Sequence, residues 1–213
     1  MINHYGIQDL RNLDSNILRK IKSSEIVTNG KYCQELEQKI KSIVSSKYCV
    51  VCNSGTSALM MSLMALKLKK IIAIIPNINF VAISSIISIF KGKIALCDVN
   101  LNTGMVDIDS FKNVIKECDK KNIKPNLFVP VHYAGNIAVL KGISKICKKR
   151  KINIIEDGCH SFGSYKLNNN VKEYVGNCAN SKMTTFSFHP VKNITTFEGG
   201  AITTNNKSFY EKL

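Results

Sequence analysis

Short aliphatic runs alternate with longer stretches in which apolar residues recur at helical spacing along most of the chain. The runs have the length of buried strands, and the longer stretches have the length of helices packed on a sheet. The predicted strands are Cys49–Cys52, Ile71–Ile75, Lys93–Cys97, Leu127–Val131, Ile152–Ile155, Phe186–His189 and Ala201–Thr204. The predicted helices are Leu13–Ile21, Tyr32–Val44, Ala58–Leu68, Phe80–Phe90, Asp109–Cys118 and Leu140–Arg150. This alternation predicts one α/β unit with a largely parallel sheet rather than a helix bundle or a β-sandwich.

The two ends of the chain depart from this rhythm. Residues 1–46 read as an N-terminal arm of helical segments joined by a turn at Asn29-Gly30, and residues 47–213 form the main domain. Ser208–Leu213 begins another helical pattern without a terminating glycine. We therefore expect the chain to be a fragment of a longer protein.

Composition and charge narrow the class of protein. A hydrophobic fraction of 45% over 213 residues excludes a disordered chain. The net charge of +15 comes from lysines that are spread along the sequence. This spread favours a solvated surface over a surface that binds nucleic acid. No apolar stretch is long enough to cross a bilayer, and Met1–Tyr5 lacks a signal-peptide pattern. The expected location is the cytosol, with no membrane partner.

The eight cysteines do not form a metal-ligand pattern. Only Cys49 and Cys52 have paired spacing, and they lie within an apolar, strand-like run. A zinc site needs a second matching pair, and a redox motif normally begins a helix. We expect buried free thiols and no bound metal.

A candidate phosphate site lies where the strand Cys49–Cys52 leads into a helix. Gly55, Thr56 and Ser57 offer unpaired helix N-terminal amides and two hydroxyls, which suit an anion. An ordinary helix cap would use the same residue types. Ser187, on a later strand, could reach the same phosphate.

Lys192 and Asp157 are the candidate catalytic residues. Lys192 lies between a strand and the pair Gly199-Gly200, and a lysine amine can condense with a carbonyl cofactor. Asp157 ends a buried strand, where its carboxylate could pair with a protonated pyridine nitrogen or could cap the next turn. The pattern indicates a pyridoxal phosphate site.

Further candidate side chains lie at or near the ends of predicted elements. Phe80 could stack on a flat cofactor or pack in the core. His160 could touch the cofactor or substrate, or could be structural. Ligands in open α/β sheets gather beyond the carboxyl ends of strands, so Gly55, Asp98, His132 and Asp157 could all edge one crevice.

Four segments of the sequence resemble those of a known protein family in their residue types and in their order along the chain. They are Gly55–Leu59, Asn79–Ala82, Glu156–Gly163 and Phe186–Ala201. They resemble the DegT/DnrJ/EryC1/StrS sugar aminotransferases, and Tyr5–Gln8 and Val27–Gly30 look like that family's N-terminal substrate-side segments. The resemblance spans nearly the whole chain and implies a three-layer fold-type-I large domain. A family member normally continues into a C-terminal small domain, which this sequence lacks.

The resemblance also implies a role for each matching residue. Lys192 would attach covalently to pyridoxal 5'-phosphate, Asp157 would pair with the ring nitrogen, and Phe80 would stack on the ring. The phosphate would be held by Gly55, Thr56, Ser57 and Ser187, with a further ligand from a partner subunit of a homodimer. His160 matches a position near the ring oxygen, and His189 matches a branch feature without an assigned role. Gly158 and Cys159 replace the family's usual pair of alanines.

The implied reaction is transfer of an amino group from L-glutamate to a 4-keto nucleotide sugar. The wording around Lys192 looks closest to the C4 transaminases of the pseudaminic acid and aminoarabinose type, which act on UDP-linked sugars for cell-surface glycans. A dehydratase or isomerase of the same family is the alternative enzyme, although dehydratases often carry histidine in place of the lysine. An incomplete fragment acting as a binding module and a basic nucleic-acid binder are the non-catalytic alternatives.

Overall fold

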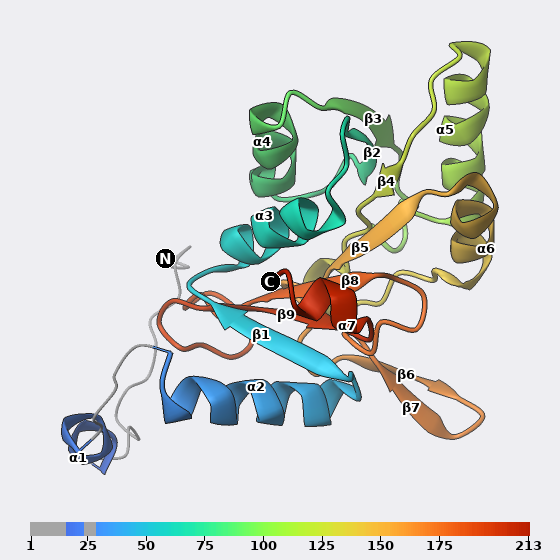
Figure 1. The fold of residues 1–213 in the computed structure, drawn as a ribbon. Helices are drawn as coiled ribbons and strands as arrows, with labels where there is room; N and C mark the ends of the chain where they lie inside the picture. Colours follow the sequence, from blue (N-terminus) through green and yellow to red (C-terminus); the bar gives the residue numbers. More distant parts are fainter. Residues whose placement is uncertain (1–15, 24–28) are drawn as a thin grey trace, which may run out of the picture.

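The computed structural model describes residues 16–23 and 29–213. Seven of the described strands form one sheet in the order β1-β9-β8-β5-β4-β2-β3 (Figure 1). The strands are β1 Tyr48–Cys52, β2 Ile72–Pro76, β3 Lys93–Cys97, β4 Leu127–Phe128, β5 Asn153–Asp157, β6 Tyr165–Asn168, β7 Val171–Tyr174, β8 Met183–Ser187 and β9 Gly200–Thr204. Neighbours from β3 to β8 pair in parallel, whereas β9 runs antiparallel to both β8 and β1. The predicted α/β fold with a mostly parallel mixed sheet is confirmed.

Helices cover both faces of the sheet, which produces three layers (Figure 1). The helices are α1 Asn16–Lys22, α2 Lys31–Val44, α3 Gly55–Leu66, α4 Val81–Ile89, α5 Ile108–Lys120, α6 Lys141–Arg150 and α7 Lys207–Tyr210, with a short 3-10 helix at Tyr133–Gly135. One core lies between α3, α4 and the sheet, and a second lies between the sheet and α5 and α6. A third core packs α2 against β1, β8 and β9 on the same face as α5 and α6.

The sequence explains where the helices begin and which face they bury. In α5, Phe111, Ile115 and Cys118 recur at helical spacing and are buried against the sheet. Asp107 caps this helix by accepting hydrogen bonds from the amides of Asp109 and Ser110. The same logic moves the start of α3 from the predicted Ala58 to Gly55, because Ser54 supplies the cap.

Other predicted boundaries also shift. β4 ends at Phe128 rather than Val131, because Pro130 has no N–H to continue the ladder. The last two predicted strands begin earlier, with β8 at Met183 and β9 at Gly200. The first predicted helix corresponds to α1, while Tyr5–Gln8 and Val27–Thr28 lie outside the described residues.

The hairpin of β6 and β7 was not predicted. Its turn, Asn169-Asn170, has φ of 48° and 63°, the left-handed geometry of a tight two-residue hairpin turn. Its residues are exposed or half-buried, so the hairpin contains no apolar run that would mark buried strands.

Candidate active site

The N-terminus of α3 forms a cradle of polar groups beside the end of the sheet. Ser54 Oγ accepts a hydrogen bond from the Ser57 amide at 3.1 Å and lies 3.0 Å from Ser57 Oγ. The amides of Gly55 and Thr56 belong to the first turn, where no intrahelical partner exists. These amides and the positive end of the helix dipole suit an anion.

Two glycines allow the cradle to pack closely against the sheet. A Cβ at Gly55 would lie 2.7 Å from Ser187 Cβ and 2.9 Å from Cys159 Sγ. A Cβ at Gly200 would overlap the carbonyl of Ser54 and would lie 2.8 Å from the Gly55 nitrogen. Gly55 and Ser187 were predicted to share one site, and the structure brings them together. Gly200 was not among the predicted site residues, although the pair Gly199-Gly200 signalled a close approach of the backbone.

Strand alternation places Asp157 on the face of the sheet that carries α3. Ile155, two residues before it in β5, packs in the core beneath α3 and α4. Asp157 is 4% exposed, and its Oδ1 accepts a hydrogen bond from the Cys159 amide at 3.0 Å. The turn-capping alternative is therefore present, and it engages one oxygen of the carboxylate.

Lys192 lies in the loop between β8 and β9. The loop turns back on itself there, since the Lys192 amide donates to the His189 carbonyl at 2.9 Å. Burial raises the pKa of the Cys159 thiol well above its ordinary value; the charge of Asp157 adds to this rise, and that of Lys192 opposes it. Both charges therefore contribute to the electrostatic surroundings of this thiol.

The same two charges act on His160. Burial lowers the pKa of His160, the charge of Lys192 lowers it further, and that of Asp157 acts in the opposite direction. The neutral imidazole is favoured as a result. Its ring lies 5.7 Å from that of Tyr133, a half-exposed residue that was not predicted as part of the site.

Phe80 precedes α4 and is 66% exposed, so the alternative of core packing is wrong within the described structure. The proposed crevice also needs correction. Asp98 is exposed and bonded to Asn77 at 2.9 Å, and His132 is 1% exposed with its ring bonded to Glu156. The imidazole of His132 is therefore buried and bonded to Glu156, so it does not share one open crevice with Asp98.

The remaining candidates are local features. His189 accepts a hydrogen bond from the Val191 amide and lies 3.8 Å from Glu198 within the loop.

All eight cysteines are free thiols, as predicted, and five of them are buried. Among the described residues, no cluster of His, Cys, Asp and Glu could hold a metal, and no helix could span a membrane.

A three-layer α/β fold with a lysine, a buried carboxylate and a helix N-terminal cradle at one sheet edge defines the class of fold-type-I pyridoxal phosphate enzymes. The sequence profile of the DegT/DnrJ/EryC1/StrS aminotransferase family matches residues 8–213, and the chain belongs to that family. Members of the family depend on pyridoxal phosphate.

Individual relatives support the same placement. The chain is 33% identical over 211 residues to a UDP-4-amino-4,6-dideoxy-N-acetyl-beta-L-altrosamine transaminase of Campylobacter jejuni, covering 98% of the chain and 53% of that protein. It resembles Helicobacter pylori PseC, an aminotransferase of pseudaminic acid biosynthesis, with a TM-score of 0.83 and 26% identity over 98% of this chain and 53% of the other. It also resembles a GDP-4-keto-6-deoxymannose-3-dehydratase, with a TM-score of 0.75 and 28% identity over 85% of this chain and 46% of the other. The chain spans about half the length of the curated relatives it matches.

Proposed function

We propose that this chain carries the cofactor site of an aminotransferase that moves the amino group of L-glutamate to a 4-keto nucleotide sugar. The altrosamine transaminase and PseC are the relatives that support this substrate class. By the same analogy the sugar is a UDP-linked deoxy-keto hexosamine destined for a cell-surface glycan. The enzyme works in the cytosol as a homodimer.

Pyridoxal phosphate fits the residues that surround the cradle. The amides of Gly55 and Thr56 and the hydroxyls of Thr56 and Ser57 would hold its phosphate, and Ser187 would add a further hydroxyl from β8. The closeness of Gly55 to Ser187 and Cys159 supports this assignment, because any side chain at position 55 would fill the cradle.

The aromatic ring of the cofactor has its own set of residues. Asp157 is the acceptor for the ring nitrogen, and Lys192 is the point of covalent attachment. Phe80 would cover the ring, which would account for a phenylalanine left 66% exposed in the described structure. His160 would lie near the ring oxygen.

Each of these residues has a chemical task. Bound pyridoxal phosphate supplies an electron-withdrawing ring. Asp157 keeps a proton on the ring nitrogen, because its buried carboxylate favours a positive neighbour. With the cofactor bound, the Lys192 amine would be the base that accepts the proton from the α-carbon of glutamate. Burial lowers the pKa of His160 and favours its neutral form.

The proposal depends on one observation: the N-terminus of α3 meets the ends of β5 and β8, where a Cβ at Gly55 would lie 2.7 Å from Ser187 Cβ and 2.9 Å from Cys159 Sγ, and the Cys159 amide donates to Asp157. The test is the visible absorbance of the purified protein with pyridoxal phosphate, before and after borohydride, in Lys192→Ala and in the exposed control Lys148→Ala. We expect Lys192→Ala to lose the lysine-bound absorbance and to lose turnover of UDP-4-keto sugars with glutamate, while Lys148→Ala keeps both. Turnover retained by Lys192→Ala would contradict the assignment.

A sugar dehydratase or isomerase of the same family is the second candidate, favoured by the similarity to the GDP-4-keto-6-deoxymannose dehydratase. Lys192 favours transamination, because the dehydratases of the family often carry histidine there. The two reactions differ in product. Transamination yields an amino sugar and one equivalent of 2-oxoglutarate, whereas dehydration yields a deoxy sugar without a new amine.

A further inference from the structure

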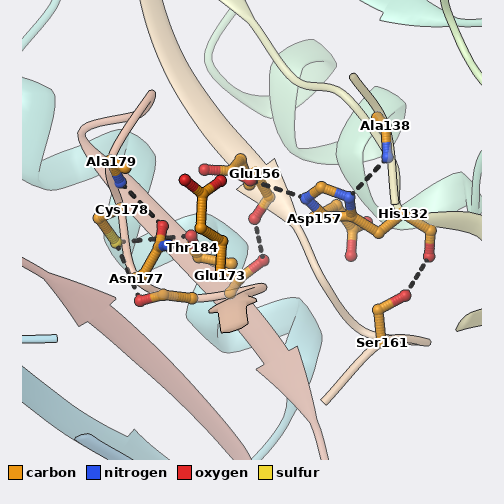
Figure 2. Close-up of polar contacts among 12 residues, drawn as sticks. His132, Ala138, Glu156, Asp157, Ser161, Glu173, Asn177, Cys178, Ala179 and Thr184 are labelled. Carbon is orange, nitrogen blue, oxygen red and sulfur yellow. Dashed lines mark hydrogen bonds and ion pairs between the residues drawn. The ribbon is translucent and has the colours of Figure 1, made fainter. Parts of the chain in front are cut away.

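His132 forms hydrogen bonds with four residues next to the candidate site. It is 1% exposed, and its amide donates to the Asp157 carbonyl at 2.9 Å. Its carbonyl accepts a hydrogen bond from Ser161 Oγ at 2.8 Å. Its ring lies between Glu156 Oε2, 2.8 Å from Nε2, and the Ala138 amide, 3.1 Å from Nδ1 (Figure 2). One residue therefore contacts both ends of the segment from Glu156 to Ser161.

These contacts fix the protonation of the ring. The Ala138 amide can only donate, so Nδ1 must offer a lone pair, and Nε2 must carry the hydrogen that is donated to Glu156. A second proton on the ring would place two N–H groups against each other at Ala138. His132 is therefore a neutral imidazole held in one orientation.

Glu156 binds the His132 ring on the face of the sheet opposite to Asp157. Alternation along β5 directs its side chain away from the face that carries Asp157. Burial opposes ionisation of this carboxyl, but the hydrogen bond from His132 opposes that effect, and the pKa of Glu156 lies below its ordinary value, with help from the charge of Lys166. Losing the bond to His132 would leave the buried carboxylate less well compensated, so the pair holds the imidazole in place.

We propose that His132 is a positioning residue that sets the place of the Asp157 carboxylate relative to Lys192 and the α3 cradle. The ring is tied to Glu156, the main chain is tied to Asp157, and the carbonyl is tied to Ser161, which closes the turn carrying Cys159 and His160. This inference rests on the proposed function only in assigning Asp157 to the cofactor ring. The restraint itself concerns the residues of this chain.

Three variants separate positioning from mere support of the fold. His132→Phe keeps most of the volume and removes both ring hydrogen bonds. Glu156→Gln keeps an oxygen that accepts from Nε2. The double variant His132→Phe with Glu156→Leu replaces the buried pair by apolar side chains, a change that often restores stability.

Affinity for pyridoxal phosphate and thermal stability are measured on all three. We expect His132→Phe to weaken binding by about tenfold or more, the loss typical when a residue that orients a ligand-binding group is removed. Glu156→Gln should stay closer to the parent protein. The double variant should recover stability without recovering affinity. Recovery of both together, or unchanged affinity in His132→Phe, would overturn the proposal.

A second readout needs no cofactor. Cys159 lies in the restrained turn, and Cys147 lies on the buried face of α6, so labelling of both thiols is followed by mass spectrometry on the apo protein. We expect Cys159 to be labelled about tenfold faster in His132→Phe and in the double variant, with Cys147 unchanged in the double variant. A parallel rise at both thiols of the double variant, or no rise at Cys159, would refute positioning. Failure of the parent to bind pyridoxal phosphate would instead count against the proposed function.

Discussion

Gly200→Ala is expected to damage the fold and the phosphate cradle together. Gly200 pairs with Ser187 on one side and Cys52 on the other, so the sheet fixes its backbone. An added Cβ would overlap the carbonyl of Ser54 and would lie 2.8 Å from the nitrogen of Gly55. All of these atoms belong to the backbone, and Ser54 also caps α3. Neither side of the contact can move without breaking hydrogen bonds.

The magnitude follows from two contributions. Forcing an extra carbon into a packed site costs about 1 to 3 kcal/mol. Displacing the Ser54 cap adds about 1 kcal/mol. Against a typical total stability of about 5 to 15 kcal/mol, a loss of about 2 to 4 kcal/mol is large. For a chain of this size it corresponds to a Tm lower by about 4 to 16 °C.

Gly142→Ala is the matched control. A Cβ there would also overlap a neighbour, but that neighbour is Cδ1 of Ile108, the end of a flexible side chain. Gly142 lies in α6, where alanine is favoured over glycine by up to about 1 kcal/mol. The two variants are compared by urea unfolding followed by circular dichroism, with binding of pyridoxal phosphate measured alongside. A Gly142→Ala protein as unstable as Gly200→Ala, or a Gly200→Ala protein as stable as the parent, would refute the argument from backbone contact.

Two further predictions concern the thiols and a helix cap. Burial raises the pKa of Cys97 and Cys147 to about 12 and that of Cys178 to about 11. These thiols should therefore react with a thiol reagent far more slowly in the native protein than in the protein unfolded by urea. Equal rates under the two conditions would contradict their burial. The hydrogen bond from the Ser110 amide holds the pKa of Asp107 below its ordinary value. The ionised Asp107 therefore stabilises the folded protein above about pH 4, and this contribution is lost as the pH falls through the lowered pKa of Asp107. Asp107→Ala should cost about 1 kcal/mol at neutral pH, with a difference from the parent that shrinks in acid, whereas Asp107→Asn should lose less.

Strands with an apolar run could be predicted from the sequence, and the hairpin without one could not. The runs that became β2 and β5 are almost wholly buried in the interior of the sheet, where hydrophobicity decides position, whereas the equally apolar run of β3 forms a largely exposed edge strand. The hairpin of β6 and β7 is held instead by local pairs, including a Lys166–Glu173 salt bridge of 3.2 Å and a tilted contact between Tyr165 and Tyr174. Its Asn169-Asn170 turn was the available signal, and no hydrophobic pattern accompanied it.

Residues whose roles depend on strand pairing could not be predicted from the sequence either. Nothing local to Gly200 indicates that it meets the cap of α3, because that contact requires the pairing of β9 with β1 and β8. His132 likewise read as one polar residue after a strand. Its role as a buried link depends on the Ala138 amide and on the side chain of Glu156, which the fold brings together.

The neighbouring acids Glu156 and Asp157 show how pairing decides chemistry. As a sequence they are two carboxylates at the end of one strand, and either could serve a cofactor. In β5 they point to opposite faces, and parallel pairing with β8 sets Asp157 beside Thr185, two residues before Ser187. Only Asp157 therefore shares a face with the α3 cradle, while the side chain of Glu156 is held on the opposite face by its hydrogen bond with His132. Shifting the β5–β8 register by one residue would exchange the two acids and separate the carboxylate from the lysine.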